Sequence, residues 1–130
     1  MRIAAFIGPS GSGKTTLIVS LIRHFVAHGE RVAAIKHTHH PLNEERRGDT
    51  FKFERAGAAP VFMAGDADAV VFTHEATRRI TFASPEDLLA QIDADIVFVE
   101  GFKEFAGWPH ISSLDFEEAL GILSRIWPSR

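Results

Sequence analysis

The stretch GPSGSGKTT, from Gly8 to Thr16, decides the fold of this 130-residue chain. Its first eight residues fit the pattern G-x-x-x-x-G-K-[ST] without a gap, and this pattern typically joins a buried strand to a helix. The flanking residues agree, because the apolar run RIAAFI precedes the stretch and LIVSLIRHF, with apolar residues at helical spacing, follows it. The stretch therefore predicts a phosphate-binding loop near the start of an α/β domain.

The residue types of this loop suit a triphosphate. Glycine lets the backbone curl so that successive N–H groups point at phosphate oxygens, and the N-terminus of the next helix adds partial positive charge. Lys14 has the position of the lysine that reaches the β- and γ-phosphates, and the Thr15 hydroxyl has the position of a Mg²⁺ ligand. We predict that the nucleotide is bound by Ser10, Gly11, Ser12, Gly13, Lys14, Thr15 and Thr16.

The rest of the chain alternates strand-like and helix-like segments. The runs RVAAIKH, APVFMAG, AVVFT and DIVFVEG predict strands, and RITFA is a further candidate. Helices are expected after the loop as far as His28, in DTFKFERAGA with Asp49 as N-cap, in SPEDLLAQI with Ser84 as N-cap, and in SSLDFEEALGILSRIW. This alternation predicts one α/β domain over residues 1–130, with a P-loop NTPase-like three-layer fold. Its sheet should be mostly parallel, with some antiparallel strands between residues 60 and 83.

Composition limits the classes of partner. The chain has 14 Lys and Arg against 17 Asp and Glu, so no basic excess points to nucleic acid or to an anionic membrane surface. Cysteine is absent, which excludes disulfides and thiolate metal sites. The N-terminal apolar run is too short for a signal peptide or a membrane span, so we expect a cytoplasmic protein.

Two carboxylates are candidates for holding Mg²⁺ together with Thr15. Glu100 closes the apolar run IVFV, and a carboxylate at the end of a buried strand needs a partner such as a metal. Asp49 follows the loop after the second strand, where it can serve the metal or act as a helix N-cap. Asp95 precedes the same strand that Glu100 closes, so it should lie at the opposite edge of the sheet with a structural role.

The motif KHTHH, residues 36–40, ends the second predicted strand. Strand alternation would place His37 and His39 on the same side, at the edge that faces the nucleotide. Together with His40 and Arg47 they form a candidate loop for a second anionic ligand or a partner. A transition-metal site is an alternative, although the sequence shows no third ligand at a defined spacing. Solvated loop histidines are the remaining interpretation.

The segments GPSGSGKTTL, KHTHH, GDT, RAGA and EGFK occur in an order and at spacings that resemble the MobB family of molybdopterin-guanine dinucleotide biosynthesis adaptor proteins. The resemblance covers most of residues 2–103. It implies a cytoplasmic, homodimeric P-loop protein that binds GTP with Mg²⁺, hydrolyses it weakly and assists the guanylyltransferase that joins GMP to molybdopterin. It also implies that Gly11 to Thr16 hold phosphates and that Thr15 and Glu100 serve Mg²⁺. Asp49 matches an acidic residue of the family's loop.

Two other functions remain open. A small P-loop kinase that uses ATP on a metabolite would need a lid, for which Arg46, Arg47 and Arg55 are available, but 130 residues leave little chain for an acceptor domain. A GTP-dependent metallochaperone would use the histidine loop. The guanine signatures N-K-x-D and T-K-x-D are absent, so the preference for GTP rests on the resemblance. Without an obvious water-positioning glutamine or arginine finger, we expect at most a slow Mg²⁺-dependent GTPase, about 10⁻⁴ per second, with Lys14 and Glu100 as its catalytic groups.

Overall fold

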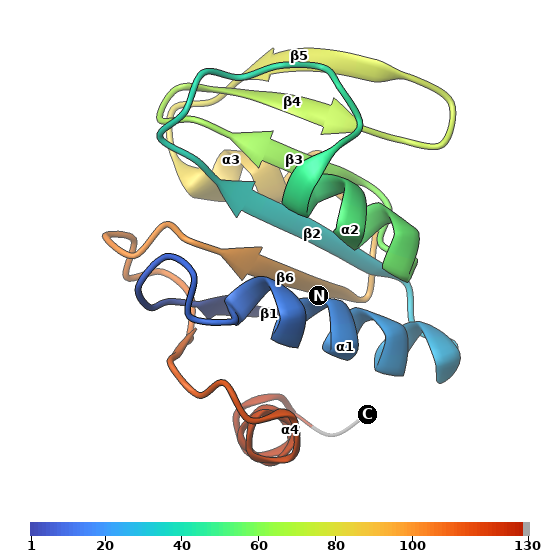
Figure 1. Cartoon of the computed structure of the whole chain (residues 1–130), viewed down its shortest axis with the longest axis vertical. Coiled ribbons are helices and arrows are strands. Elements are labelled where there is room, and N and C mark those ends of the chain that lie inside the picture. Colours follow the sequence, from blue (N-terminus) through green and yellow to red (C-terminus); the bar gives the residue numbers. More distant parts are fainter. Residues whose placement is uncertain (129–130) are drawn as a thin grey trace.

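A computed structural model describes residues 1–128. Within these residues, seven strands form one sheet and four helices pack against it (Figure 1). The strands are β1 (Arg2–Phe6), β2 (Val32–His37), β3 (Val61–Ala64), β4 (Asp68–Phe72), β5 (Thr77–Thr81), β6 (Ile96–Glu100) and β7 (His110–Ile111). The helices are α1 (Lys14–Ala27), α2 (Gly48–Ala56), α3 (Pro85–Leu89) and α4 (Phe116–Ile126). Across the described residues, no helix is both long and apolar enough to cross a membrane.

The strands follow the order β5-β4-β3-β2-β6-β1-β7. The neighbours from β3 to β7 in this order pair in parallel, whereas β4 pairs antiparallel with both β3 and β5. The prediction of a mostly parallel sheet with antiparallel strands in the middle of the chain is confirmed. The short strand β7, which pairs with the end of β1, was not predicted, because two residues are too few to show a strand period.

Three parallel strands end side by side at one edge of the sheet. Phe6 and Lys36 are both register partners of Glu100, so β1 and β2 flank the end of β6. The loops that follow these strands therefore start next to one another, although they lie far apart in the sequence. They are the predicted phosphate-binding loop after β1 (residues 8–16, called the P-loop below), the loop that begins with the motif KHTHH at the end of β2 (called the histidine loop), and the segment GFK after β6.

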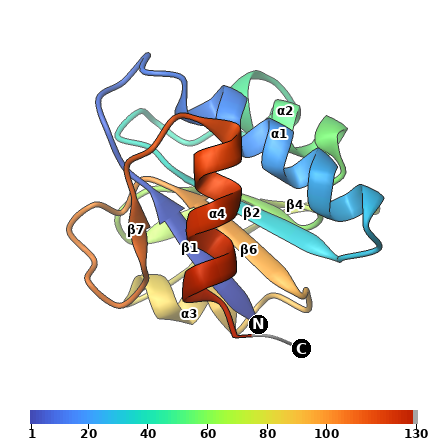
Figure 2. The same ribbon diagram turned by 90° about the horizontal axis from the view of Figure 1, so that it is seen from below.

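The sheet has two buried faces. Helices α1 and α2 cover one face and α3 lies on the other (Figure 2), while α4 shares the hydrophobic core of α1. Alternate residues of each strand point to opposite faces, as on β6, where Ile96 and Phe98 face α1 while Val97 and Val99 face α3. We call these the α1 face and the α3 face. The parity of a strand residue therefore decides which face its side chain reaches.

A tryptophan packs on each face. On the α1 face, Trp127 follows α4, and its Nε1 donates to the backbone oxygen of Ile3 at 3.1 Å, which ties the end of α4 to β1. On the α3 face, Trp108 is 6% exposed and packs edge-on against Phe102 and Phe105. The α3 face thus relies on aromatic side chains of the segment after β6 as well as on a short helix.

Most predicted helix ends are confirmed. Helix α1 ends at Ala27, before Gly29 with φ of +84°, and Ser84 forms a capping box with Asp87 at the start of α3. Asp95 has the structural role predicted for it, since it accepts from the backbone and guanidinium of Arg31 at 2.8 and 3.2 Å. The prediction that Asp49 is an N-cap is wrong.

Helix α2 begins earlier than the sequence suggested. It starts at Gly48, so its N-cap is Arg47, and Asp49 lies inside the first turn. The side chain of Asp49 turns toward β2 and pairs with Lys36 instead of capping its own helix. Asp49 therefore forms an ion pair between α2 and β2 instead of a cap within α2.

Candidate functional site

The P-loop has the backbone that a phosphate site needs. Gly11 and Gly13 adopt φ of +75° and +104°, conformations that glycine reaches without a steric penalty. Gly13 is also the N-cap of the 14-residue helix α1 and brings no capping side chain. The first N–H groups of α1 are therefore left to an anion or to water, and they lie at the positive end of the helix dipole.

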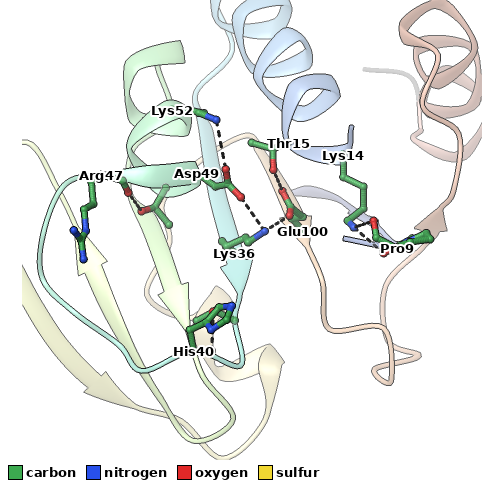
Figure 3. A network of polar contacts seen from close by, with 12 residues as sticks. Pro9, Lys14, Thr15, Lys36, His40, Arg47, Asp49, Lys52 and Glu100 are labelled. Atoms are coloured by element: carbon green, nitrogen blue, oxygen red, sulfur yellow. Dashed lines mark hydrogen bonds and ion pairs between the residues drawn. The ribbon is translucent and has the colours of Figure 1, made fainter. Parts of the chain in front are cut away.

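The side chains of the loop are arranged around a cavity of about 1210 Å³. Lys14 Nζ donates to the carbonyl oxygens of Gly8 and Pro9, at 2.7 and 2.9 Å, so the lysine folds back over its own loop (Figure 3). Ser12 Oγ is buried with no hydrogen-bond partner among the described residues, while the backbone N–H of Ser12 donates to the carbonyl oxygen of Pro9 at 3.3 Å. The other predicted loop residues line the cavity: Ser10, Gly11, Gly13, Lys14, Thr15 and Thr16.

The residues predicted to hold Mg²⁺ lie together at the end of β6. Thr15 Oγ1 donates to Glu100 Oε1 at 2.7 Å. Lys36 Nζ forms an ion pair with the other oxygen of Glu100 and lies 3.1 Å from Asp49 Oδ2 (Figure 3). The Glu100 side chain is only 5% exposed, so this carboxylate depends on its neighbours for compensation. We call Thr15, Lys36, Asp49 and Glu100 the magnesium cluster.

Lys36 is the member of this cluster that the sequence analysis missed. Its position follows from parity and register. Val32 and Ala34 face α1, so Lys36, the next residue of the same parity, faces α1 too. The register then places Lys36 opposite Glu100 on the neighbouring strand. The sequence reveals that Lys36 has the same parity as Val32 and Ala34, but it does not reveal that β2 pairs with β6.

The charges of the cluster stabilise one another. Burial alone would lower the pKa of Lys36, but its contacts with Glu100 and Asp49 outweigh burial and raise that pKa above the ordinary value. Burial likewise would raise the pKa of Asp49, but Lys36, with smaller contributions from Thr15 and Lys52, lowers it below the ordinary value. Both groups are therefore charged over the whole physiological pH range.

The cluster fits a hard divalent cation. A hydroxyl and two carboxylates are oxygen ligands of the kind that Mg²⁺ prefers, and they surround a cation of the protein's own, the Lys36 ammonium. They also lie beside the P-loop, where the β- and γ-phosphates of a nucleotide would supply further oxygens. The residues present thus suit a magnesium ion that arrives with a nucleotide.

His37, the next residue of β2, points to the α3 face. Its ring stacks on Phe102 at 4.1 Å with an interplanar angle of 7°, and the ring of His39 lies 4.8 Å away. His37 Nε2 is 2.9 Å from Asp66 Oδ1, and the backbone N–H of Phe102 donates to Nδ1 at 3.4 Å. The prediction that His37 and His39 share a side is confirmed, although β2 ends at His37 and His39 lies in a bend, so the loop and not strand alternation brings the two rings together.

The structure adds a third potential metal ligand that the sequence analysis did not find. Asp66, in the turn between β3 and β4, lies with His37 and His39 so that their ligand atoms are all within 4.8 Å of one another. Two imidazoles and one carboxylate are a known ligand set for transition metals. The donor from Phe102 favours the tautomer with the proton on Nε2, so a metal at that atom has to displace the proton.

The remaining two residues of the predicted second-ligand loop, His40 and Arg47, both line a smaller cavity of about 250 Å³, but only His40 also lines the main one. His40 lines the cavity, and its backbone N–H donates to Thr38 Oγ1 at 3.1 Å. Arg47, whose side chain is 70% exposed, pairs with Glu45 at 2.9 Å at the start of α2. The arrangement therefore supports His40, and not Arg47, as a neighbour of His37 and His39 in the cavity.

The main cavity extends from the magnesium cluster to the cluster of His37, His39 and Asp66. Its lining includes the P-loop and the magnesium cluster on the α1 side, and His37, His39 and Asp66 on the α3 side. Aromatic side chains from the segment after β6, Phe102 and Phe105, complete the α3 side. The volume of about 1210 Å³ exceeds the usual range for one small ligand, so it leaves room for a second group beside a nucleotide.

The chain is similar to proteins of one family. The sequence model of the family described as "Molybdopterin guanine dinucleotide synthesis protein B", MobB, matches residues 3–112. The molybdopterin-guanine dinucleotide biosynthesis adapter protein of Haemophilus influenzae is 38% identical over 101 residues, which are 75% of this chain and 54% of the relative. The protein of the same name from Escherichia coli is 35% identical over 105 residues, 78% of this chain and 59% of the relative.

Solved structures give the same fold. The MobB homolog from Bacillus stearothermophilus has a TM-score of 0.52 and 24% identity, with 95% of this chain and 71% of that chain covered. MobB from Bacillus subtilis has a TM-score of 0.51 and 20% identity, with 94% and 73% covered. The chain spans about half the length of the curated relatives it matches. Because the family model covers most of its length, the chain belongs to the MobB family of molybdopterin guanine dinucleotide synthesis proteins.

Proposed function

We propose that this chain binds GTP with Mg²⁺, hydrolyses it slowly, and acts as an adapter in molybdopterin guanine dinucleotide synthesis. The observation that carries the proposal is the convergence of the P-loop with Thr15, Asp49 and Glu100 at one edge of the sheet, in a chain of the MobB family. The adapter role is supported by the relatives in Haemophilus influenzae and Escherichia coli, which are named adapter proteins.

Each part of the site has a role in this proposal. The N–H groups of the loop and of the first turn of α1 bind the phosphates, and Lys14 exchanges the carbonyl oxygens of Gly8 and Pro9 for phosphate oxygens. Thr15, Glu100 and Asp49 hold Mg²⁺, directly or through water. The ion, when bound, neutralises charge on the β- and γ-phosphates.

The lining of the cavity supports a slow reaction. Among the described residues that line it there is neither a glutamine to orient water nor an arginine to stabilise the transition state. Arg46, in the loop before α2, is engaged outside the cavity, because it pairs with Glu54 and donates to the backbone oxygen of Thr73 at 2.8 Å. This removes Arg46 from the lid that the kinase alternative needs.

Membership of the MobB family supports a proposal about partners. We propose that a homodimer of this protein engages the guanylyltransferase that joins GMP to molybdopterin, and that the partner enzyme supplies any catalytic group that the cavity lacks. The room left in the cavity beside a nucleotide supports a complex in which a second group enters from the α3 side.

The test is a calorimetric titration of the protein with GTP and with ATP, each with and without Mg²⁺. We expect tighter binding of GTP, and affinity that rises with Mg²⁺. A clear preference for ATP would overturn the proposal and favour the kinase, and the next step would be a search for an acceptor. Equal affinity with and without Mg²⁺ would remove the magnesium cluster from the proposal while leaving the P-loop in it.

The cluster of His37, His39 and Asp66 favours a second candidate function, the binding of a transition metal by a GTP-dependent metallochaperone. The test is a titration with Zn²⁺ and Ni²⁺ of the wild type and of the His37→Ala/His39→Ala double variant. Stoichiometric binding that the double variant loses would support this function, and it should weaken as the pH falls because the histidines must be neutral to bind. A protein that binds neither ion at micromolar concentration would exclude it.

A further inference from the structure

The position of Lys36 has a consequence for how the cation enters the site. Its ammonium lies between Glu100 and Asp49, and Glu100 in turn accepts from the Thr15 hydroxyl (Figure 3). These three oxygen-bearing side chains are the ones that suit Mg²⁺. The lysine therefore lies among the groups that a metal ion would need.

The charges of the cluster explain why such a lysine is useful. Glu100 is nearly buried and Asp49 is about one-third exposed, and both approach the Lys36 ammonium, so without Lys36 two carboxylates would lie close together with no positive charge between them. Such a pair attracts a divalent cation on its own. With Lys36 present, one carboxylate is compensated and the space between them is occupied.

We propose that Lys36 is an internal counter-ion that keeps the magnesium ligands in place in the nucleotide-free protein and prevents them from binding a divalent cation without nucleotide. This inference rests on the proposed function, in that the cluster is taken to bind Mg²⁺. The triphosphate brings the additional negative charge that makes the exchange of the ammonium for Mg²⁺ favourable. Lys36 is thus a positioning residue that sets the order of binding.

The fixed place of Lys36 supports this role over that of an ordinary surface ion pair. Lys36 is held by the register of β2 with β6, and its side chain is only 25% exposed. By contrast, Lys52 is 64% exposed and lies 3.7 Å from the other oxygen of Asp49, within the same helix. Lys52 touches the same carboxylate from outside the cluster, so it provides a matched control.

The test is a titration of the nucleotide-free protein with Mn²⁺, a spectroscopic substitute for Mg²⁺, followed by the electron paramagnetic resonance signal of the free ion. We compare the wild type with Lys36→Met and with the control Lys52→Met. We expect Lys36→Met to bind Mn²⁺ at least about tenfold more tightly than the wild type, because a positive charge close to the ligands is removed. Lys52→Met should bind as the wild type does.

Two further variants keep the outcome clear. If Lys36→Met does not fold, Lys36→Gln retains a hydrogen-bond donor without the charge and should show the same gain in Mn²⁺ affinity. The double variant Lys36→Met/Glu100→Gln should lose the gain, since one ligand loses its charge. A folded Lys36→Met or Lys36→Gln that binds Mn²⁺ no more tightly than the wild type would overturn the inference.

The same preparations separate this inference from the proposed function. A wild type that binds Mn²⁺ tightly without nucleotide would overturn the role of Lys36, yet GTP binding with Mg²⁺ could still be measured in that protein. A wild type that binds no nucleotide would overturn the proposed function, whereas the gain of Mn²⁺ binding in Lys36→Met would still be seen. The two failures therefore give different results.

Discussion

Lys36 and His37 are neighbours on β2, but they belong to two different halves of the cavity. Lys36 faces α1 and joins Glu100 and Asp49, whereas His37 faces α3 and joins Phe102 and Asp66. The α1 half is charged and suits phosphate and a hard cation, while the α3 half is aromatic and rich in imidazole. A motif that looks like a unit in the sequence is thus divided by the alternation of a strand.

Gly101 follows β6 and lies against His37 of β2, where the two halves of the cavity meet. Its replacement should have the largest effect on stability. Gly101 has φ of +105°, and an added Cβ would lie 2.7 Å from the Cβ of His37. We expect Gly101→Ala to lower the free energy of unfolding by about 3 kcal/mol, from backbone strain and overpacking together. Urea denaturation measures this.

Gly29→Ala is the control for Gly101→Ala. Gly29 also has a positive φ, of +84°, but nothing lies within 4 Å of an added Cβ, so we expect a loss of about 1 kcal/mol from strain alone. Equal losses in the two variants would mean that β2 and the end of β6 can separate at no cost, and that the two halves are not rigidly joined.

Loss of the P-loop lysine should affect nucleotide binding alone. We expect Lys14→Ala to weaken GTP binding by about 100-fold, because a charge-assisted contact with phosphate is lost, while the fold survives. Among the hydrogen bonds of the described residues, Lys14 donates only to carbonyl oxygens of its own loop. Arg23→Ala, at an exposed position of the same helix, should bind GTP normally. Unchanged affinity in a folded Lys14→Ala would remove the phosphate assignment.

The dependence on Mg²⁺ should distinguish the two halves. We define the magnesium gain as the ratio of the dissociation constants for GTP without and with Mg²⁺. Glu100→Ala should reduce this gain by about tenfold, since a metal ligand is lost, whereas His37→Ala should leave it unchanged. A magnesium gain that falls equally in both variants would show that the halves act as one site.

The smallest effect is the pH dependence of the Lys36–Asp49 pair. The lowered pKa of Asp49 contributes stability above the unfolded-state value of about 4, and this is lost as the pH falls through the folded-state pKa. The raised pKa of Lys36 contributes stability that is complete below the unfolded-state value of about 10.5 and is lost only as the pH rises through the folded-state pKa.

We therefore expect Asp49→Asn to destabilise the protein by less than about 1 kcal/mol between pH 5 and 9, since the carboxylate is about one-third exposed, and by less below about pH 4. Thermal unfolding across this range measures the difference. On the other half, Asp66→Asn changes a carboxylate that is 83% exposed and should have a smaller effect. A destabilisation by Asp49→Asn that grows toward acid pH would contradict the direction of the pKa shift.

The sequence predicted the features that local rules determine. The P-loop between β1 and α1, the strand that ends at Glu100 and the capping box at Ser84 depend on residues within a few positions of one another, and each was found where expected. These local features are enough to predict that Thr15 and Glu100 lie at the same edge of the sheet, as they do.

The features that were missed depend on which segments lie side by side. Lys36 joins the magnesium cluster through the register of β2 with β6, and Asp66 approaches His37 through the turn between β3 and β4. For Asp49 the sequence leaves a metal-linked role and a local cap both open, because it does not reveal the distant partner Lys36. Strand order and register are set by the packing of the whole sheet, so a single sequence does not reveal them.

The two tryptophans give each face of the sheet its own optical reporter. The chain has only two, with Trp108 against Phe102 on the α3 face and Trp127 beside Phe98 on the α1 face. In Trp127→Phe the remaining emission comes from Trp108, which packs against Phe102 and Phe105 of the cavity lining. In Trp108→Phe it comes from Trp127, at the end of α4. The intrinsic fluorescence of Trp127→Phe can therefore follow the arrival of a ligand beside Phe102 and Phe105 in real time, without any label attached to the protein.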